Sequence, residues 1–189
     1  NNTMLVVVDC DRPSIIDEPD LLTMVKTKVV FDHHRQSSET IQGAVLSYCE
    51  PYASSASELI AEMMQYIREG IKAKPIEADC MYGGIVIDTR EFTNQTGVRT
   101  FEAAAYLRRC GADIIRIRKT FREDFIDYQA KADTISKADI YREYYAISTL
   151  ERAGTESPTV LCAKAANELL NIRGIKASIV LTKVEDTVF

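Results

Sequence analysis

The sequence predicts an α/β fold built on parallel strands, and three observations support this. Two short β-branched runs, residues 4–9 (MLVVVD) and 28–32 (KVVFD), each end in an aspartate, as buried parallel strands often do. Between them, residues 18–27 place apolar side chains at helical spacing, as a short crossover helix would. In such a strand-helix-strand unit both strands run the same way. Asp9 and the Asp32-His33-His34 triplet should therefore emerge at one edge of the sheet, where open α/β sheets bind ligands.

Helices are predicted after this unit. Ser55 and Glu58 have the spacing of a capping box at the start of a long amphipathic helix. Residues 78–88 fit a buried helix better than a strand at 85–87, with glycines that permit close packing. On the helical interpretation Asp88 lies near a helix C-terminus, where the backbone dipole disfavours an anion, so a positive group should neutralise it. Thr100 is predicted to cap the next helix, over residues 101–110.

The second half of the chain restarts the pattern. A polar, helix-prone stretch from about Phe121 to Asp139 is typical of a connector. Beyond it come a strand (EYYAISTLE), a helix over 158–172 capped by Ser157, and a strand that runs into a turn (IKASIVLTKVEDTVF). These patterns predict a first α/β domain over residues 1–118, a helical connector over 119–140 and a smaller α/β domain over 141–189.

Composition narrows the class of function. The 189 residues carry a net charge of −5, which gives little support to a broad cationic surface for long nucleic acid, whereas small phosphorylated ligands remain suitable. Five widely spaced cysteines without a C-x-x-C pair indicate a reducing compartment. No apolar run is long enough to span a bilayer, so the piece is expected to be soluble and to make no membrane contact.

The candidate chemistry lies in three places: Asp9, the Asp32-His33-His34 triplet and Asp88. Carboxylates together with imidazole suit manganese, iron, zinc or magnesium. Each aspartate alone is more often a turn former or a cap, and paired histidines can be incidental surface residues. Convergence at one sheet edge favours a site. Neighbouring side chains at a strand end are expected to point apart, so that one histidine faces the floor of the site and the other faces a bound molecule.

The blocks VVVDCDRPS, VVFDHHR, EPYASSASEL, GGIVIDTREFTNQTG and RTFEAAAYLR follow one another as in a known family. In this order they resemble the DHH phosphoesterase superfamily with its DHH-associated C-terminal domain. Their residues are most similar to those of the bacterial cyclic di-AMP phosphodiesterases of the GdpP type. The resemblance covers essentially the whole chain. Five ordered blocks make it far more specific than the three letters DHH.

The resemblance implies a site with two manganese ions. It assigns Asp9 as a bridging ligand and His33 and Asp88 as further ligands, while His34 would face the scissile phosphate and Asp32 would orient the triplet. It implies hydrolysis of cyclic di-AMP to the linear dinucleotide pApA, by attack of a metal-bound hydroxide on phosphorus. Arg99 is a candidate for binding a substrate phosphate, with a surface ion pair as the alternative. Ser55 is a candidate substrate contact, although helix capping already explains it.

The sequence also departs from the family pattern. An upstream motif of one histidine and two aspartates, which completes the metal site, and a downstream glycine-rich G-G-G-H segment are absent. The piece alone is therefore expected to be inactive. Family members of this type imply a longer protein at the cytoplasmic face of the bacterial cell membrane, with the piece itself cytoplasmic, and leave homodimerisation open. Alternative functions are a nanoRNA or short-oligonucleotide phosphoesterase of the same superfamily, and a non-catalytic fragment that binds a nucleotide or haem.

Overall fold

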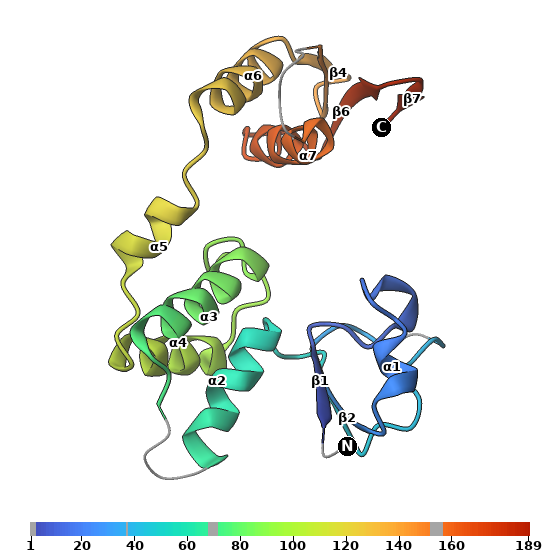
Figure 1. The fold of residues 1–189 in the computed structure, drawn as a ribbon. Helices are drawn as coiled ribbons and strands as arrows, with labels where there is room; N and C mark the ends of the chain where they lie inside the picture. The colour runs from blue at the N-terminus through green and yellow to red at the C-terminus, as the bar shows by residue number, and fades with distance from the viewer. Residues whose placement is uncertain (1–2, 37, 68–71, 152–156) are drawn as a thin grey trace. The chain divides into compact units, whose positions relative to one another are not determined.

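A computed structural model of the chain describes residues 3–36, 38–67, 72–151 and 157–189. Its contacts divide the chain into two compact units, Asn1–Phe121 and Arg122–Phe189. The elements of the first unit are, in chain order, β1 (Met4–Val8), the 3₁₀ helix η1 (Pro13–Ile15), α1 (Leu21–Met24), β2 (Thr27–Asp32), β3 (Leu46–Cys49), α2 (Ala56–Ile67), α3 (Pro75–Asp88), α4 (Val98–Arg109) and α5 (Ile114–Thr120) (Figure 1).

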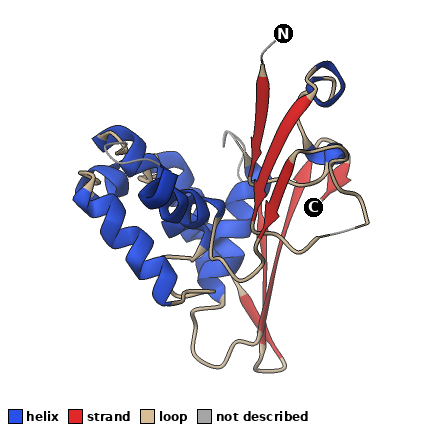
Figure 2. Ribbon diagram, turned by 90° about the horizontal axis from the view of Figure 1, so that it is seen from below, coloured by secondary structure: helices blue, strands red, loops and turns tan. Residues whose placement is uncertain are grey.

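The sheet of the first unit is parallel, as the sequence predicts, and its strands follow the order β1-β2-β3 (Figure 2). Strands β1 and β2 lie side by side in register, with Val8 opposite Phe31. The crossover between them carries the short helix α1, so the predicted strand-helix-strand unit is confirmed. Strand β3 is an addition that the sequence reasoning did not identify; it pairs with β2 so that Cys49 lies opposite Asp32. All three strands therefore end at one edge.

Helices α2 to α5 pack on one another around a core that includes the buried residues Ala61, Ala78, Ile85, Ala103 and Leu107. Residues 78–88 are helical, as preferred from the sequence, and Asp88 is the last residue of α3. A Cβ atom built on Gly84 would lie 2.4 Å from Oγ of Ser57, so this glycine does permit the close approach of α3 to α2.

Three capping predictions need correction. Ser157 occupies the N-cap position of the helix that begins at Pro158, but its side chain makes no capping hydrogen bond. Helix α4 begins at Val98 after Gly97, and Thr100 lies inside its first turn, where its Oγ1 accepts the N–H of Gly97 at 3.1 Å. At α2, Oγ of Ser55 accepts the N–H of Glu58, but the Glu58 carboxylate turns to the hydroxyl of Ser54 instead of closing a box on Ser55. A polar side chain that bonds to a neighbouring backbone group has several partners within reach, and the sequence pattern does not choose among them.

The second unit contains α6 (Phe125–Ser136), β4 (Asp139–Tyr141), β5 (Tyr145–Leu150), α7 (Pro158–Leu169), β6 (Ala177–Val184) and β7 (Thr187–Val188). Its sheet has the order β4-β5-β6-β7, with β5 and β6 parallel and both outer strands antiparallel. The helix expected as a connector is α6, and it packs against α7 and β5. A buried side of α6, with Ala130 and Thr134, explains why this polar helix joins the unit.

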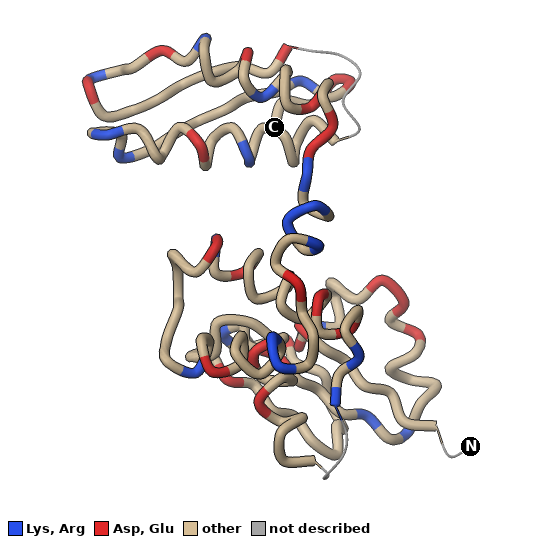
Figure 3. The backbone as a smooth tube through the Cα atoms, turned by 90° about the vertical axis from the view of Figure 1, so that its left-hand side faces the viewer, with Lys and Arg blue, Asp and Glu red and all other residues tan. Residues whose placement is uncertain are grey.

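Basic and acidic residues are interspersed along the backbone of each unit (Figure 3), and acidic residues are in excess, which gives the net charge of −5. Within the described ranges, the structure contains no helix long and apolar enough to cross a membrane.

Candidate functional site

The candidate site lies at the carboxyl edge of the first sheet. Strand β1 ends at Val8, and Asp9 follows with φ 64°, a left-handed conformation that a non-glycine residue rarely adopts. The N–H of Asp9 donates to the carbonyl of Phe31 at 2.9 Å, which extends the pairing with β2 by one step. The turn in the backbone thus follows immediately after the last strand bond. Such rare conformations cluster at functional sites.

The three predicted metal ligands, Asp9, His33 and Asp88, lie close to one another, with His33 near both carboxylates. Nε2 of His33 lies 3.3 Å from Oδ1 of Asp9 and 3.8 Å from Oδ2 of Asp88. The His33 side chain is 11% exposed, whereas Asp9 and Asp88 are partly open to solvent. The sheet edge supplies Asp9 and His33, and the C-terminus of α3 supplies Asp88. Carboxylate and imidazole donors of this kind suit a divalent ion of the manganese, iron or zinc class. The three residues whose ligand atoms all lie within 4.8 Å of one another are Asp9, His33 and His34, and Asp88 approaches this group through His33.

Burial at a helix end perturbs Asp88. Loss of hydration raises the pKa of the Asp88 carboxyl above its ordinary value, and the nearby Asp9 raises it further, while His33 and His34 oppose the shift. The positive group expected beside Asp88 stays a prediction, because the neighbouring His33 carries a charge only when it is protonated. A dication in this position would favour the ionised form of both carboxylates.

Asp32 holds the other histidine. It is fully buried, its Oδ1 accepts the backbone N–H of His33 at 2.9 Å, and the same oxygen lies 2.8 Å from Nδ1 of His34. The hydrogen bond to Asp32 raises the pKa of His34, partial burial acts in the opposite direction, and the charges of Asp32, Asp9 and Asp88 add to the increase. Asp32 therefore orients His34 and favours its protonated form, with Nε2 left for a ligand.

The expectation that the two histidines point apart is wrong. Their ring centroids are 4.4 Å apart with an interplanar angle of 48°, and a nitrogen of each ring lies within 4.8 Å of a carboxylate oxygen of Asp9. Both histidines follow the last residue of β2, so the alternation of a strand no longer governs their directions. The partners of the rings differ nonetheless, since His33 meets Asp9 and Asp88 while His34 meets Asp32.

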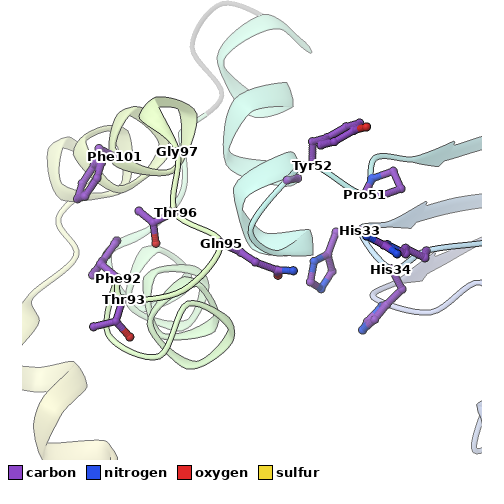
Figure 4. A pocket seen from close by; sticks show the side chains of 12 residues that line it. His33, His34, Pro51, Tyr52, Phe92, Thr93, Gln95, Thr96, Gly97 and Phe101 are labelled. Carbon is purple, nitrogen blue, oxygen red and sulfur yellow. The ribbon is translucent and has the colours of Figure 1, made fainter. Parts of the chain in front are cut away.

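A cavity of about 1130 Å³ opens beside the histidines (Figure 4). Its lining residues are His33, His34, Arg35, Pro51, Tyr52, Ala53, Phe92, Thr93, Gln95, Thr96, Gly97 and Phe101. Figure 4 shows Gln95 pointing from the loop after α3 toward His33. Arg35 and Gln95 were missed from the sequence, although Arg35 directly follows the triplet. The position of Gln95 depends on the path of its loop, which has left-handed backbone conformations at Arg90, Glu91, Phe92 and Gln95. No sequence signal predicts these conformations.

The two predicted substrate contacts lie elsewhere. Arg99 donates from Nε and Nη2 to the two carboxylate oxygens of Glu62, both at 2.7 Å, so the structure contains the ion pair that was the alternative. Ser55 is completely buried, and its hydroxyl caps α2. Neither residue lines the cavity.

In sequence, the chain is similar to a known family and to curated phosphodiesterases. Residues 1–85 match the family model described as the DHH family, N-terminal domain. The cyclic-di-AMP phosphodiesterase GdpP of Geobacillus thermodenitrificans is 42% identical over 185 residues, covering 98% of this chain and 28% of that protein. The cyclic-di-AMP phosphodiesterase PdeA of Listeria monocytogenes is 41% identical over 180 residues, covering 95% of this chain and 27% of that protein. The chain thus spans less than a third of the length of these curated relatives.

A solved structure, that of an exopolyphosphatase-related protein from Bacteroides fragilis, superimposes with a TM-score of 0.85 at 21% identity. The match covers 98% of this chain and 56% of that one. At this level of identity the likeness concerns the fold.

Proposed function

Because the chain belongs to the DHH family, we propose that it forms part of a metal-dependent phosphodiesterase that hydrolyses cyclic di-AMP to pApA. One observation supports the proposal: His33 lies close to both Asp9 and Asp88, at 3.3 and 3.8 Å, directly beside His34, which bonds to Asp32. The proposed substrate, cyclic di-AMP, is the one named for the two relatives with 42% and 41% identity.

We assign the metal to Asp9, His33 and Asp88, and manganese is the ion that the resemblance implies. Bound divalent ions would supply Lewis-acid stabilisation of charge on phosphate oxygens and would lower the pKa of a coordinated water. The three side chains are suited to this role because each offers a hard or borderline donor and two are anionic. The family resemblance implies a second ion, for which this group alone provides too few donors. We therefore expect residues 1–189 alone to turn over cyclic di-AMP very slowly.

His34 would stabilise the transition state. With Nδ1 held by Asp32, Nε2 lies on the other side of the His34 ring and would donate its hydrogen to a phosphoryl oxygen as negative charge accumulates there. Arg35 lines the same cavity and would add a second cationic contact to phosphate. The cavity exceeds the usual range for small-molecule sites, about 300–1,000 Å³, so a dinucleotide has room.

The test uses a polypeptide that carries the complete domain pair. It is incubated with cyclic di-AMP, cyclic di-GMP and short oligonucleotides, with manganese or with a chelator, and the products are separated by chromatography. We expect manganese-dependent formation of pApA and preference for cyclic di-AMP. Preferential cleavage of short oligonucleotides would favour the nanoRNA phosphoesterase alternative. Binding of cyclic di-AMP without any hydrolysis in manganese would contradict an enzymatic role.

A further inference from the structure

A second group of potential metal ligands includes Asp32, the residue that bonds to His34. Asp32 ends β2 and Cys49 ends β3, and Asp11 lies three residues after the end of β1. Asp32 and Cys49 are paired across the two strands. One carboxylate oxygen from each aspartate and Sγ of Cys49 all lie within 4.8 Å of one another.

This group contains polar atoms that are buried without a partner. Asp11 is 3% exposed and Asp32 is fully buried. Within the described part of the chain, Oδ2 of each carboxylate has no hydrogen-bond donor. The exposed side chain of Arg12 places its Nε 3.9 Å from the other oxygen of Asp11, Oδ1. A buried carboxylate oxygen left without a partner costs about 1–3 kcal/mol or more, so such atoms call for an unseen ligand.

The chemistry of the donors indicates which ligand this is. A buried water would supply hydrogen bonds but would not offset the charge of two adjacent carboxylates. A divalent cation would offset it. Two carboxylate oxygens and a sulfur form a softer set than Asp9, His33 and Asp88, and thiolate favours zinc over manganese or magnesium.

We propose that Asp11, Asp32 and Cys49, two buried carboxylates and a partly buried thiol, form a separate site for a thiophilic divalent cation of the zinc class. The cation would join the ends of β1, β2 and β3. It would engage Oδ2 of Asp32 and leave Oδ1 for His33 and His34, which fixes the carboxylate that orients the active histidine. This site lies outside the proposed function, since occupancy can be measured whether or not cyclic di-AMP is hydrolysed.

The experiment titrates the full chain, stripped of metal, with cobalt(II) as a spectroscopic probe. A cobalt ion bound by Cys49 gives an intense near-ultraviolet thiolate-to-cobalt charge-transfer band, which a site of carboxylates and imidazole does not produce. We expect Cys49→Ser to reduce this band at least about tenfold. Two matched variants should keep it: Cys80→Ser, which removes an exposed cysteine of α3, and His33→Ala, which removes a ligand of the other group.

Asp11→Asn provides a second route, because it keeps the shape of the side chain if Cys49→Ser fails to fold. We expect it to weaken cobalt binding at the thiolate site by at least about tenfold, with an unchanged circular dichroism spectrum. A band that survives Cys49→Ser would overturn the proposal. So would cobalt saturation of the unmodified chain without any thiolate band, in which case a buried water or a shared proton satisfies the two carboxylates.

Discussion

Oδ1 of Asp32 lies 2.8 Å from Nδ1 of His34. This contact joins a fully buried carboxylate to a half-exposed imidazole. The buried partner cannot move without breaking its bond to the backbone of His33, so the orientation of His34 depends on the strand end itself. His33 and His34 therefore contact different carboxylates, so mutation of each histidine can separate their roles.

His33→Ala and His34→Ala should differ in metal content. His33 is the histidine that contacts both Asp9 and Asp88, so its loss should reduce manganese affinity and activity together. His34→Ala should retain manganese and lower kcat by about 10²–10³-fold, the cost of removing one transition-state donor. Metal analysis of the purified variants of the complete domain pair, with kcat measured at saturating manganese, distinguishes the two. Loss of manganese from His34→Ala alone would reverse the assignment.

Arg99 should matter for stability and leave substrate binding unaffected. Its bidentate pair with Glu62 raises the pKa of the guanidinium further above its ordinary value, but the side chain is 42% exposed, which weakens the pair. A double-mutant cycle of Arg99→Ala and Glu62→Ala should give a coupling energy of about 0.5–1 kcal/mol in urea unfolding. KM for cyclic di-AMP should stay unchanged in Arg99→Ala and rise in Arg35→Ala, which serves as the cavity control. An equal rise in both variants would restore Arg99 as a substrate contact.

Thr89 should support the wall of the cavity. It is fully buried, its hydroxyl donates to the carbonyl of Ile85 at 2.6 Å, and it accepts the N–H of Phe92 at 2.9 Å. Thr89→Val leaves that N–H without its partner and should lower the free energy of unfolding by about 1–3 kcal/mol. Thr89→Ser keeps the hydroxyl and should lose less. If both variants unfold at the same urea concentration, the hydroxyl is not what stabilises this loop.

Gly84→Ala should destabilise the contact between α2 and α3. The new methyl would meet Oγ of Ser57 at 2.4 Å and its Cβ at 3.3 Å, and overpacking of this kind costs about 1–3 kcal/mol. Because removal of the Ser57 hydroxyl eliminates the shorter contact, Ser57→Ala combined with Gly84→Ala should recover part of the loss. Chemical denaturation of the four proteins in the cycle measures it. A double variant no more stable than Gly84→Ala would assign the cost to another contact.

The ion pair of Asp79 and Arg116 should make stability depend on pH. The hydrogen bonds from Arg116 and from the backbone of Asp113 lower the pKa of Asp79, against the effect of burial. A lowered folded-state pKa contributes stability above the ordinary range near about 4, and this stability is lost as the pH falls through the folded-state value. Asp79→Asn should therefore lower Tm at pH 7, and the difference should shrink in acid. A difference that grows on acidification would show that the sign is wrong.

The sequence predicts the strand ends and their shared edge well, because β-branched runs that end in aspartate leave few other arrangements. It also identifies α3, whose length and glycines favour a helix. It could not choose the partner of Arg99, since a guanidinium pairs equally well with a phosphate or with Glu62, 37 residues earlier. Nor could it supply the directions of His33 and His34, which depend on the backbone beyond β2. Strand β3 was not predicted, because its sequence, LSYC, is short and mostly polar or aromatic.

The loop from Thr89 to Gly97 closes mainly on itself and on the end of α3, through bonds that reach Thr89, Val86 and Ile85. Of the three candidate metal ligands, Asp9 and His33 follow strands, whereas Asp88 ends α3 and directly precedes this loop. The lining of the cavity thus comes from strand ends and from a separate loop that carries none of these ligands. In the proposed enzyme, exchanges at Thr93 or Gln95 would therefore alter which phosphorylated molecule is accepted without replacing a metal ligand.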